Sequence, residues 1–216
     1  RGGETGNPLF RGFGDQAREA VERYDQPVLL RLNTRDELEL RGGFPRTAEE
    51  LYGYDALILD DVEAAFFAPD QAALVRRFVA ERGGGLLMLG GQETFAAGQY
   101  ARTPIGELLP VYLDRPLAPA WSGGLKLTLT RAGWLEPWAR WREREEEQAA
   151  ALQSLPPFHV ANAVRDLKPG AQLLATLSDP KGQAHPALVT QRFGHGRTAA
   201  LLIGDLWRWG MTSPEA

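Results

Sequence analysis

A short apolar segment between two glycine clusters is the feature that most constrains how this chain folds. Leu86 to Leu89 follows Gly83 to Gly85 and runs directly into Gly90 and Gly91. Four apolar residues without polar alternation are typical of a strand that is covered on both faces. Glycine favours a sharp turn at each end, because it tolerates backbone conformations that other residues avoid.

The segments before this strand alternate between strand and helix. Residues 54–59 predict a strand, and residues 69–82 predict a helix that opens with a proline. Nearer the start, residues 15–24 predict a helix and residues 27–32 another strand. Such alternation is the signature of a doubly wound parallel sheet, with residues 91–98 at its carboxyl edge. We therefore expect burial in adjacent parallel strands for Leu29, Ile58 and Leu87.

The alternation of predicted strands and helices ends at Pro110. Residues 125–130 alternate as a half-exposed strand should, and Glu136 to Leu155 predicts one long charged helix, so residues 111–165 are interpreted as an insertion. Three further strands joined by tight turns predict an antiparallel edge: residues 171–177, 186–192 and 198–203. The prediction is a single domain over residues 1–216, with its core at about 12–110 and 166–210.

The composition excludes several classes of function. The formal net charge is −4, so we expect no nucleic-acid partner. The absence of cysteine excludes disulfides, thiolate metal sites and thiol catalysis. No apolar run approaches the ~20 residues that span a bilayer, and the first residues lack the layout of a signal peptide. Since the sequence also begins without Met, we expect a piece of a longer protein, attached to a membrane only through segments outside it.

Several segments of the sequence resemble the class I glutamine amidotransferase-like domains, which have a flavodoxin-like fold. The main likeness lies in residues 83–110, and looser ones lie in residues 54–61, 167–171, 193–197 and 205–209. The subgroup that the chain resembles occurs in bacterial membrane proteins beside von Willebrand factor A-like domains. The resemblance implies a flavodoxin-like, doubly wound, mostly parallel sheet with an inserted strand and helix and an antiparallel C-terminal edge.

The same resemblance implies that catalysis has been lost. Active members carry a catalytic Cys in the turn after this strand, whereas here Gly90 to Phe95 reads Gly-Gly-Gln-Glu-Thr-Phe. Asp205 falls near the place of the catalytic His, and an acid with an ordinary pKa is no neutral proton shuttle at pH 7. We expect an inactive domain that serves as an extracytoplasmic interaction or ligand-binding module of a larger bacterial membrane protein. Its partners would be other protein domains, it would need no cofactor, and a cytoplasmic location stays open.

A rival hypothesis uses acidic residues at strand ends. Asp60, Asp61, Glu93 and Asp205 follow predicted strands, and the carboxyl ends of parallel strands form the usual ligand crevice of this architecture. Four such acids could hold a divalent cation or serve a carbohydrate-processing or other hydrolase. The plainer interpretation is that they cap turns and helices or face solvent, so we assign no metal site and no catalytic residue. Thr94 is likewise expected to satisfy backbone amides in the turn.

The inactive interpretation predicts a contact surface instead. We expect it to combine residues 91–100, the inserted helix and residues 207–209, because strand-end loops converge at one edge of the sheet. Three tryptophans recur at spacings of four and three and would share one helical face, either as core or as an exposed aromatic platform: Trp134, Trp138 and Trp141. The candidate residues of the surface are Gln92, Glu93, Thr94, Tyr100, Asp60, Asp61, Asp205, Trp138 and Arg208.

Overall fold

The computed structural model describes residues 42–115, 121 and 123–211. The chain divides into two compact units, Arg1–Phe44 and Pro45–Ala216, and the architecture below is that of the second. The helix predicted at residues 15–24 and the strand predicted at residues 27–32, with Leu29, lie outside the described residues. Within the described ranges, no helix has the length and apolar character needed to cross a membrane.

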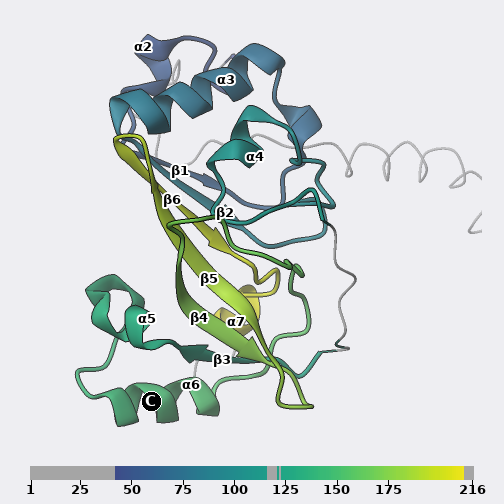
Figure 1. Cartoon of the computed structure of the whole chain (residues 1–216), viewed down its shortest axis with the longest axis vertical. Coiled ribbons are helices and arrows are strands. Elements are labelled where there is room, and N and C mark those ends of the chain that lie inside the picture. Colours follow the sequence, from purple (N-terminus) through teal and green to yellow (C-terminus); the bar gives the residue numbers. More distant parts are fainter. Residues whose placement is uncertain (1–41, 116–120, 122, 212–216) are drawn as a thin grey trace, which may run out of the picture. The chain divides into compact units, whose positions relative to one another are not determined.

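Among the described residues, six strands form one mixed sheet (Figure 1). Its parallel half consists of β1 (Ala56–Leu59), β2 (Gly85–Leu89) and β6 (Gly196–Leu201), in that spatial order. The antiparallel half continues from β6 through β5 (Ala184–Phe193) and β4 (Gln172–Ser178) to β3 (Lys126–Leu129). The parallel pairing of β1 with β2 and the antiparallel C-terminal strands agree with the sequence prediction. The protein thus has a mixed α/β fold.

Helices before and after β2 follow local sequence signals. Thr47 opens α2 (Ala48–Leu51) with a capping box, in which its hydroxyl accepts from the Glu50 amide at 3.3 Å and the Glu50 carboxylate accepts from the Thr47 amide. A proline in the first turn opens both α3 (Pro69–Arg77) and α4 (Pro104–Leu108). A 3₁₀ turn, η2, covers Ala64–Phe66.

The helix predicted over residues 69–82 is present, although its last part changes geometry. After α3 the chain continues as a π-helical segment, η3 (Phe78–Arg82), and Gly83 ends it with a left-handed φ of 89°. Figure 1 shows α2, α3 and α4 together on one side of the parallel half of the sheet. Hydrogen bonds fix α4 there, because Thr198 Oγ1 and Gln191 Nε2 both donate to the Leu108 carbonyl, at 2.7 and 2.8 Å.

The insertion contains a strand as predicted, but the single long helix from Glu136 to Leu155 is wrong. The chain forms α5 (Arg131–Leu135), a 3₁₀ turn η4 (Pro137–Ala139) and α6 (Glu145–Ser154). Gln148 is the physical reason for the break, because its Oε1 accepts from the backbone amides of Trp141 and Arg142 at 3.0 and 3.1 Å. These amides lie just before α6, so the side chain supports a non-helical segment there. The three tryptophans therefore do not share one helical face.

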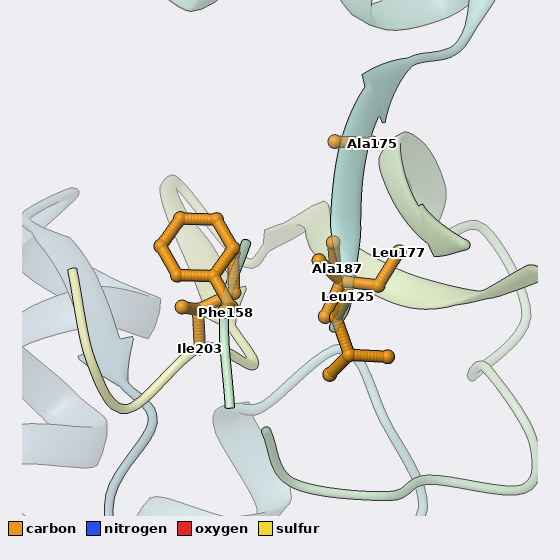
Figure 2. Close-up of a cluster of buried hydrophobic side chains, with 6 residues drawn as sticks. All are labelled: Leu125, Phe158, Ala175, Leu177, Ala187 and Ile203. Carbon is orange, nitrogen blue, oxygen red and sulfur yellow. The ribbon is translucent and has the colours of Figure 1, made fainter. Parts of the chain in front are cut away.

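Packing joins the insertion to the antiparallel half of the sheet. Figure 2 shows a buried cluster that combines two residues of the insertion with residues of the C-terminal third, made of Leu125, Phe158, Ala175, Leu177, Ala187 and Ile203. Isolated bridges pair Leu125 with Phe158 and Ala161 with Ile203. The C-terminal helix α7 (Trp207–Met211) contributes Trp209, whose ring centroid lies 4.7 Å from that of Phe158. Burial of this kind is the main favourable contribution to the folded state.

Two of the three lysines in the chain sit at helix C-termini. Lys126 Nζ donates to the carbonyls of Gln153 and Leu155, at 3.0 and 2.6 Å, where α6 ends. Lys168 Nζ donates to the carbonyls of Gly106 and Glu107 in α4, at 3.0 and 2.9 Å. Burial lowers the pKa of Lys168. Carbonyls at a helix C-terminus lack intrahelical partners and carry the negative end of the helix dipole, so an ammonium group is favourable there.

The described residues cover only one face of the parallel half. On that face Leu86 and Met88 are buried beneath the helices, whereas on the opposite face Ile58 remains 64% exposed and Leu87 is half-buried. The two residues are direct neighbours in the register of β1 and β2. The predicted burial of Ile58 is therefore wrong, because within the described part of the chain nothing packs over it.

Candidate functional site

The turn after β2 has no space for a side chain at its first two positions. A Cβ atom on Gly90 would lie 2.7 Å from Asn162 Oδ1 and 2.7 Å from the Ile203 backbone. A Cβ atom on Gly91 would meet the carboxylate of Asp61. Both separations are shorter than van der Waals contact, so neither position accepts a nucleophilic side chain without local rearrangement.

Asn162 holds this turn, and the sequence analysis did not single it out. Its Oδ1 accepts from the Gly91 amide at 3.1 Å, and its Nδ2 donates to the Gly91 carbonyl at 2.9 Å. One side-chain amide thus satisfies both backbone groups of a residue 71 positions away in the sequence. No local pattern around Asn162 indicates this contact.

Two residues that were predicted for the contact surface from the loop at residues 91–100 are buried instead. Thr94 is fully buried and donates from Oγ1 to the Gly91 carbonyl at 3.3 Å, so its hydroxyl serves a backbone carbonyl of the turn and not the amides that the sequence predicted. Tyr100 is 0% exposed and donates from its hydroxyl to the Val62 carbonyl at 2.6 Å. Burial raises the pKa of Tyr100. Neither side chain is accessible to a partner, because each packs beneath the loop that was predicted to present it.

The four acids at the strand ends do not form a metal site. Asp61 has a left-handed φ of 47°, and its Oδ1 accepts from the Glu93 amide at 2.8 Å, so it shapes the loop. Asp60, Glu93 and the neighbouring Gln92 are exposed. Among the residues that the structure describes, no group of three or more His, Cys, Asp or Glu side chains is placed to hold a metal ion.

Asp205 points into the protein and serves the backbone. It is only 3% exposed. Its Oδ2 accepts from the His159 amide at 2.8 Å, and its Oδ1 accepts from the Val160 amide at 3.3 Å. Arg208 Nε lies 3.7 Å from Oδ2. Asp205 therefore ties the end of β6 to residues 159–160, which explains an acid here without catalysis.

The predicted aromatic surface divides between two places. Trp141 joins the segment at residues 207–209, because its ring centroid lies 6.3 Å from that of Trp209. Arg208, which is partly exposed, lies with its guanidinium 5.8 Å from the centroid of the Trp207 ring. Trp138, by contrast, lines a groove on the open face of the sheet. The insertion thus contacts the C-terminal segment through Trp141 and Trp209, whereas Trp138 lies elsewhere.

The groove on the open face of the sheet is a concave feature with the character of a binding site. Its volume is about 730 Å³, within the ~300–1,000 Å³ range typical of ligand sites. Ile58, Leu87 and Ala199 form its apolar floor, and the pairing register places them side by side on β1, β2 and β6. We call this site the open-face groove. It combines an apolar floor with polar groups at its borders, as binding sites commonly do.

Charged side chains border the open-face groove at two places. Arg192 and Arg197 line it from β5 and β6, directly opposite each other in the antiparallel register. Glu136 and Trp138 line it from the insertion, and the indole Nε1 of Trp138 donates to Glu136 Oε2 at 3.0 Å. Trp138 is nevertheless 59% exposed. This arrangement can hold an apolar group against the floor and an anion at the arginines, but it presents no paired nucleophile and base.

The chain is similar in fold to several solved structures. Its sequence matches no protein-family model and no curated protein. The cytoplasmic protein STM3548 of Salmonella typhimurium aligns with a TM-score of 0.57 and 20% identity, over 79% of this chain and 68% of that one. The cytoplasmic protein STM1381 of Salmonella typhimurium LT2 aligns with a TM-score of 0.55 and 26% identity, over 78% and 68%. A β-galactosidase from Rahnella sp. R3 aligns with a TM-score of 0.44 and 15% identity, over 70% of this chain and 20% of that one. These comparisons establish that the chain shares an α/β fold with the two Salmonella proteins.

Proposed function

We propose that this chain is a non-catalytic, amidotransferase-like module with a flavodoxin-like core, which binds a protein partner on the open face of its sheet. The observation that carries the proposal is the open-face groove, with Ile58 left 64% exposed on its floor. Parallel sheets are normally covered on both faces. An apolar face with polar borders is therefore well suited to contact with another protein domain.

The turn after β2 supports the non-catalytic part of the proposal. In the family that the sequence resembles, this turn carries the nucleophile, yet here Gly90 and Gly91 leave no room for a Cβ. Asp205 is committed to two backbone amides. The rival hydrolase hypothesis also loses its support, because its acidic residues are not gathered into one site among the described residues. We expect the purified chain to release no ammonia from glutamine, as measured by a coupled ammonia assay.

The location is a further part of the proposal. We place the module on the extracytoplasmic side of a larger bacterial membrane protein, supported by the sequence resemblance and the absence of cysteine. The two Salmonella proteins are named as cytoplasmic, which makes the compartment a question in its own right. Protease accessibility of the full-length protein in intact spheroplasts answers this question. A module that is protected from added protease would lie in the cytoplasm, and a module that is cleaved would lie outside it.

Site-specific photo-crosslinking tests the binding surface. Benzoylphenylalanine at position 58 should cross-link one protein partner in cells of the source organism, because Ile58 lies on the groove floor. The same group at position 77 serves as control, since Arg77 is exposed on α3 and does not line the groove. Ile58→Asp should abolish co-purification of the partner thus identified. The control Leu135→Asp should not, because Leu135 is equally exposed at 64% but lies outside the groove lining. Equal cross-linking from both positions would rule out a specific surface.

A further inference from the structure

The two arginines at the border of the open-face groove form an unusual pair. Arg192 and Arg197 are cross-strand partners in the β5–β6 hairpin, and both are exposed. Directly opposed residues of two strands project from the same face, with their Cβ atoms about 4.5–5.5 Å apart. Like charges in this arrangement repel each other. Within the described residues, neither guanidinium has a carboxylate at ion-pair distance.

The position of the pair relates it to the apolar floor. Arg197 pairs with Gly85 on β2, and Ala199, the next residue of β6 on the same face of the sheet, pairs with Leu87. Thr190 lies opposite Ala199 on β5. The floor and the arginines are thus consecutive rows of one sheet face, so an occupant lying on the floor would bring its border within reach of both guanidinium groups.

We propose, as an extension of the proposed function, that the occupant of the open-face groove is an acidic amphipathic α-helix of the partner protein. Its apolar stripe lies on Ile58, Leu87 and Ala199, and carboxylates beside that stripe pair with Arg192 and Arg197. A helix is the element that covers the face of a parallel sheet in α/β folds. With a diameter of about 10 Å, it spans three strands spaced about 4.8 Å apart.

Charge complementarity selects an acidic helix over a basic one. Guanidinium groups bind carboxylates in a bidentate manner, and an acidic occupant also relieves the repulsion between the two arginines. Glu136, the acid that lines the groove from the insertion, already accepts from the Trp138 indole. The whole chain carries a net charge of −4, so long-range attraction would favour a basic ligand. A preference for an acidic helix must therefore come from the arginine pair itself.

Two designed peptides of about 16 residues, long enough for ~24 Å of helix, test this proposal. They share one leucine stripe, and the positions beside the stripe are Glu in one peptide and Lys in the other. Binding to the 216-residue chain is measured by isothermal titration calorimetry at about 0.05 M and about 0.5 M salt. The acidic peptide should bind at least tenfold more tightly at low salt, a difference of about 1.4 kcal/mol. High salt should reduce this difference, because the arginines are exposed.

Matched variants separate the apolar floor from the arginines. Arg192→Gln with Arg197→Gln should remove the preference for the acidic peptide and leave its binding near that of the Lys peptide. Arg46→Gln with Arg77→Gln, an equal charge change at exposed residues outside the groove, should leave the preference intact. Ile58→Asp should abolish binding of both peptides, and circular dichroism establishes that each variant is folded.

The possible failures are distinguishable. Equal binding of the two peptides, abolished by Ile58→Asp, would overturn the acidic-helix inference and leave the proposed function standing. Binding of neither peptide, together with no cross-link from position 58, would overturn both. Sedimentation equilibrium tests whether a second copy of this chain occupies the groove instead. A dimer that Ile58→Asp dissociates would show that it does, and would also overturn the inference.

Discussion

Removal of the Asp205 carboxylate should destabilise the fold and leave binding at the open-face groove unchanged. Asp205 is 3% exposed and accepts from the backbone amides of His159 and Val160 at 2.8 and 3.3 Å. A hydrogen bond to a charged group contributes ~1.5–3 kcal/mol, and the longer of these two belongs at the lower end. Asp205→Asn keeps one acceptor oxygen, so we expect a loss of about 2 kcal/mol. Asp205→Ala leaves both amides without this partner, and we expect a loss of about 3–5 kcal/mol.

Urea unfolding followed by circular dichroism measures both losses. The urea concentration at the midpoint should fall, while the slope of the unfolding free energy against urea concentration stays constant, because the surface exposed on unfolding is unchanged. Asp60→Asn is the matched control: Asp60 is an exposed acid at the end of β1, and its substitution should change stability by less than about 0.5 kcal/mol. If Asp205→Asn proves as stable as the parent chain, its hydrogen bonds contribute nothing and the acid requires another explanation.

Three further outcomes are expected from the same unfolding assay. Gly91→Ala should cost about 1–3 kcal/mol from overpacking, whereas Gly53→Ala, with its nearest neighbour 3.5 Å from the new Cβ, should be tolerated; equal effects would refute the steric argument. Lys126→Met should cost about 0.5–1 kcal/mol, since the last carbonyls of α6 lose a cationic donor; an unchanged midpoint would count against that capping role. The hydrogen bond from the Gln183 amide holds the pKa of Asp179 below its ordinary value. The ionised carboxylate therefore stabilises the fold at pH values above the ordinary pKa of Asp. This contribution is lost as the pH falls through the lower pKa of the folded state. Asp179→Asn should therefore flatten the loss of stability between about pH 2 and 5, and an unaltered acid profile would contradict the assignment.

Local sequence signals predicted the elements that depend on neighbouring residues. The glycines around Leu86–Leu89 and the proline that opens the helix at residue 69 each act within a few residues, and the structure confirms both elements. The tight turns that join the last three strands were predicted for the same reason, and β4, β5 and β6 pair as these turns require. The prediction of one long helix in the insertion failed because Gln148 reaches back seven residues to the Trp141 amide. A helical pattern in the sequence carries no information about such competition for backbone groups.

The candidate site was less predictable because burial is a tertiary property. The apolar runs of β1 and β2 indicated strands covered on both faces, and only the fold shows which face the described helices cover. Tyr100 and Asp205 were assigned to a surface from their positions after strands, yet each hydrogen-bonds to backbone far along the chain, 38 and 46 residues away. The sequence left Trp138 open between a core residue and an exposed aromatic platform, and the structure shows it exposed. Its place beside the groove floor depends on the break in the inserted helix, which the sequence did not reveal.

The two lysines that end helices have a practical consequence for chemical labelling. Lys126 and Lys168 each direct their amine to two backbone carbonyls, which reduces the access of reagents to these amines. The third lysine, Lys181, is exposed in the turn between β4 and β5. Amine-reactive dyes or surface-coupling reagents should therefore react with Lys181 well before the other two side chains. Among the lysines, this hairpin tip is then the main site of coupling, and the open face stays accessible for interaction measurements.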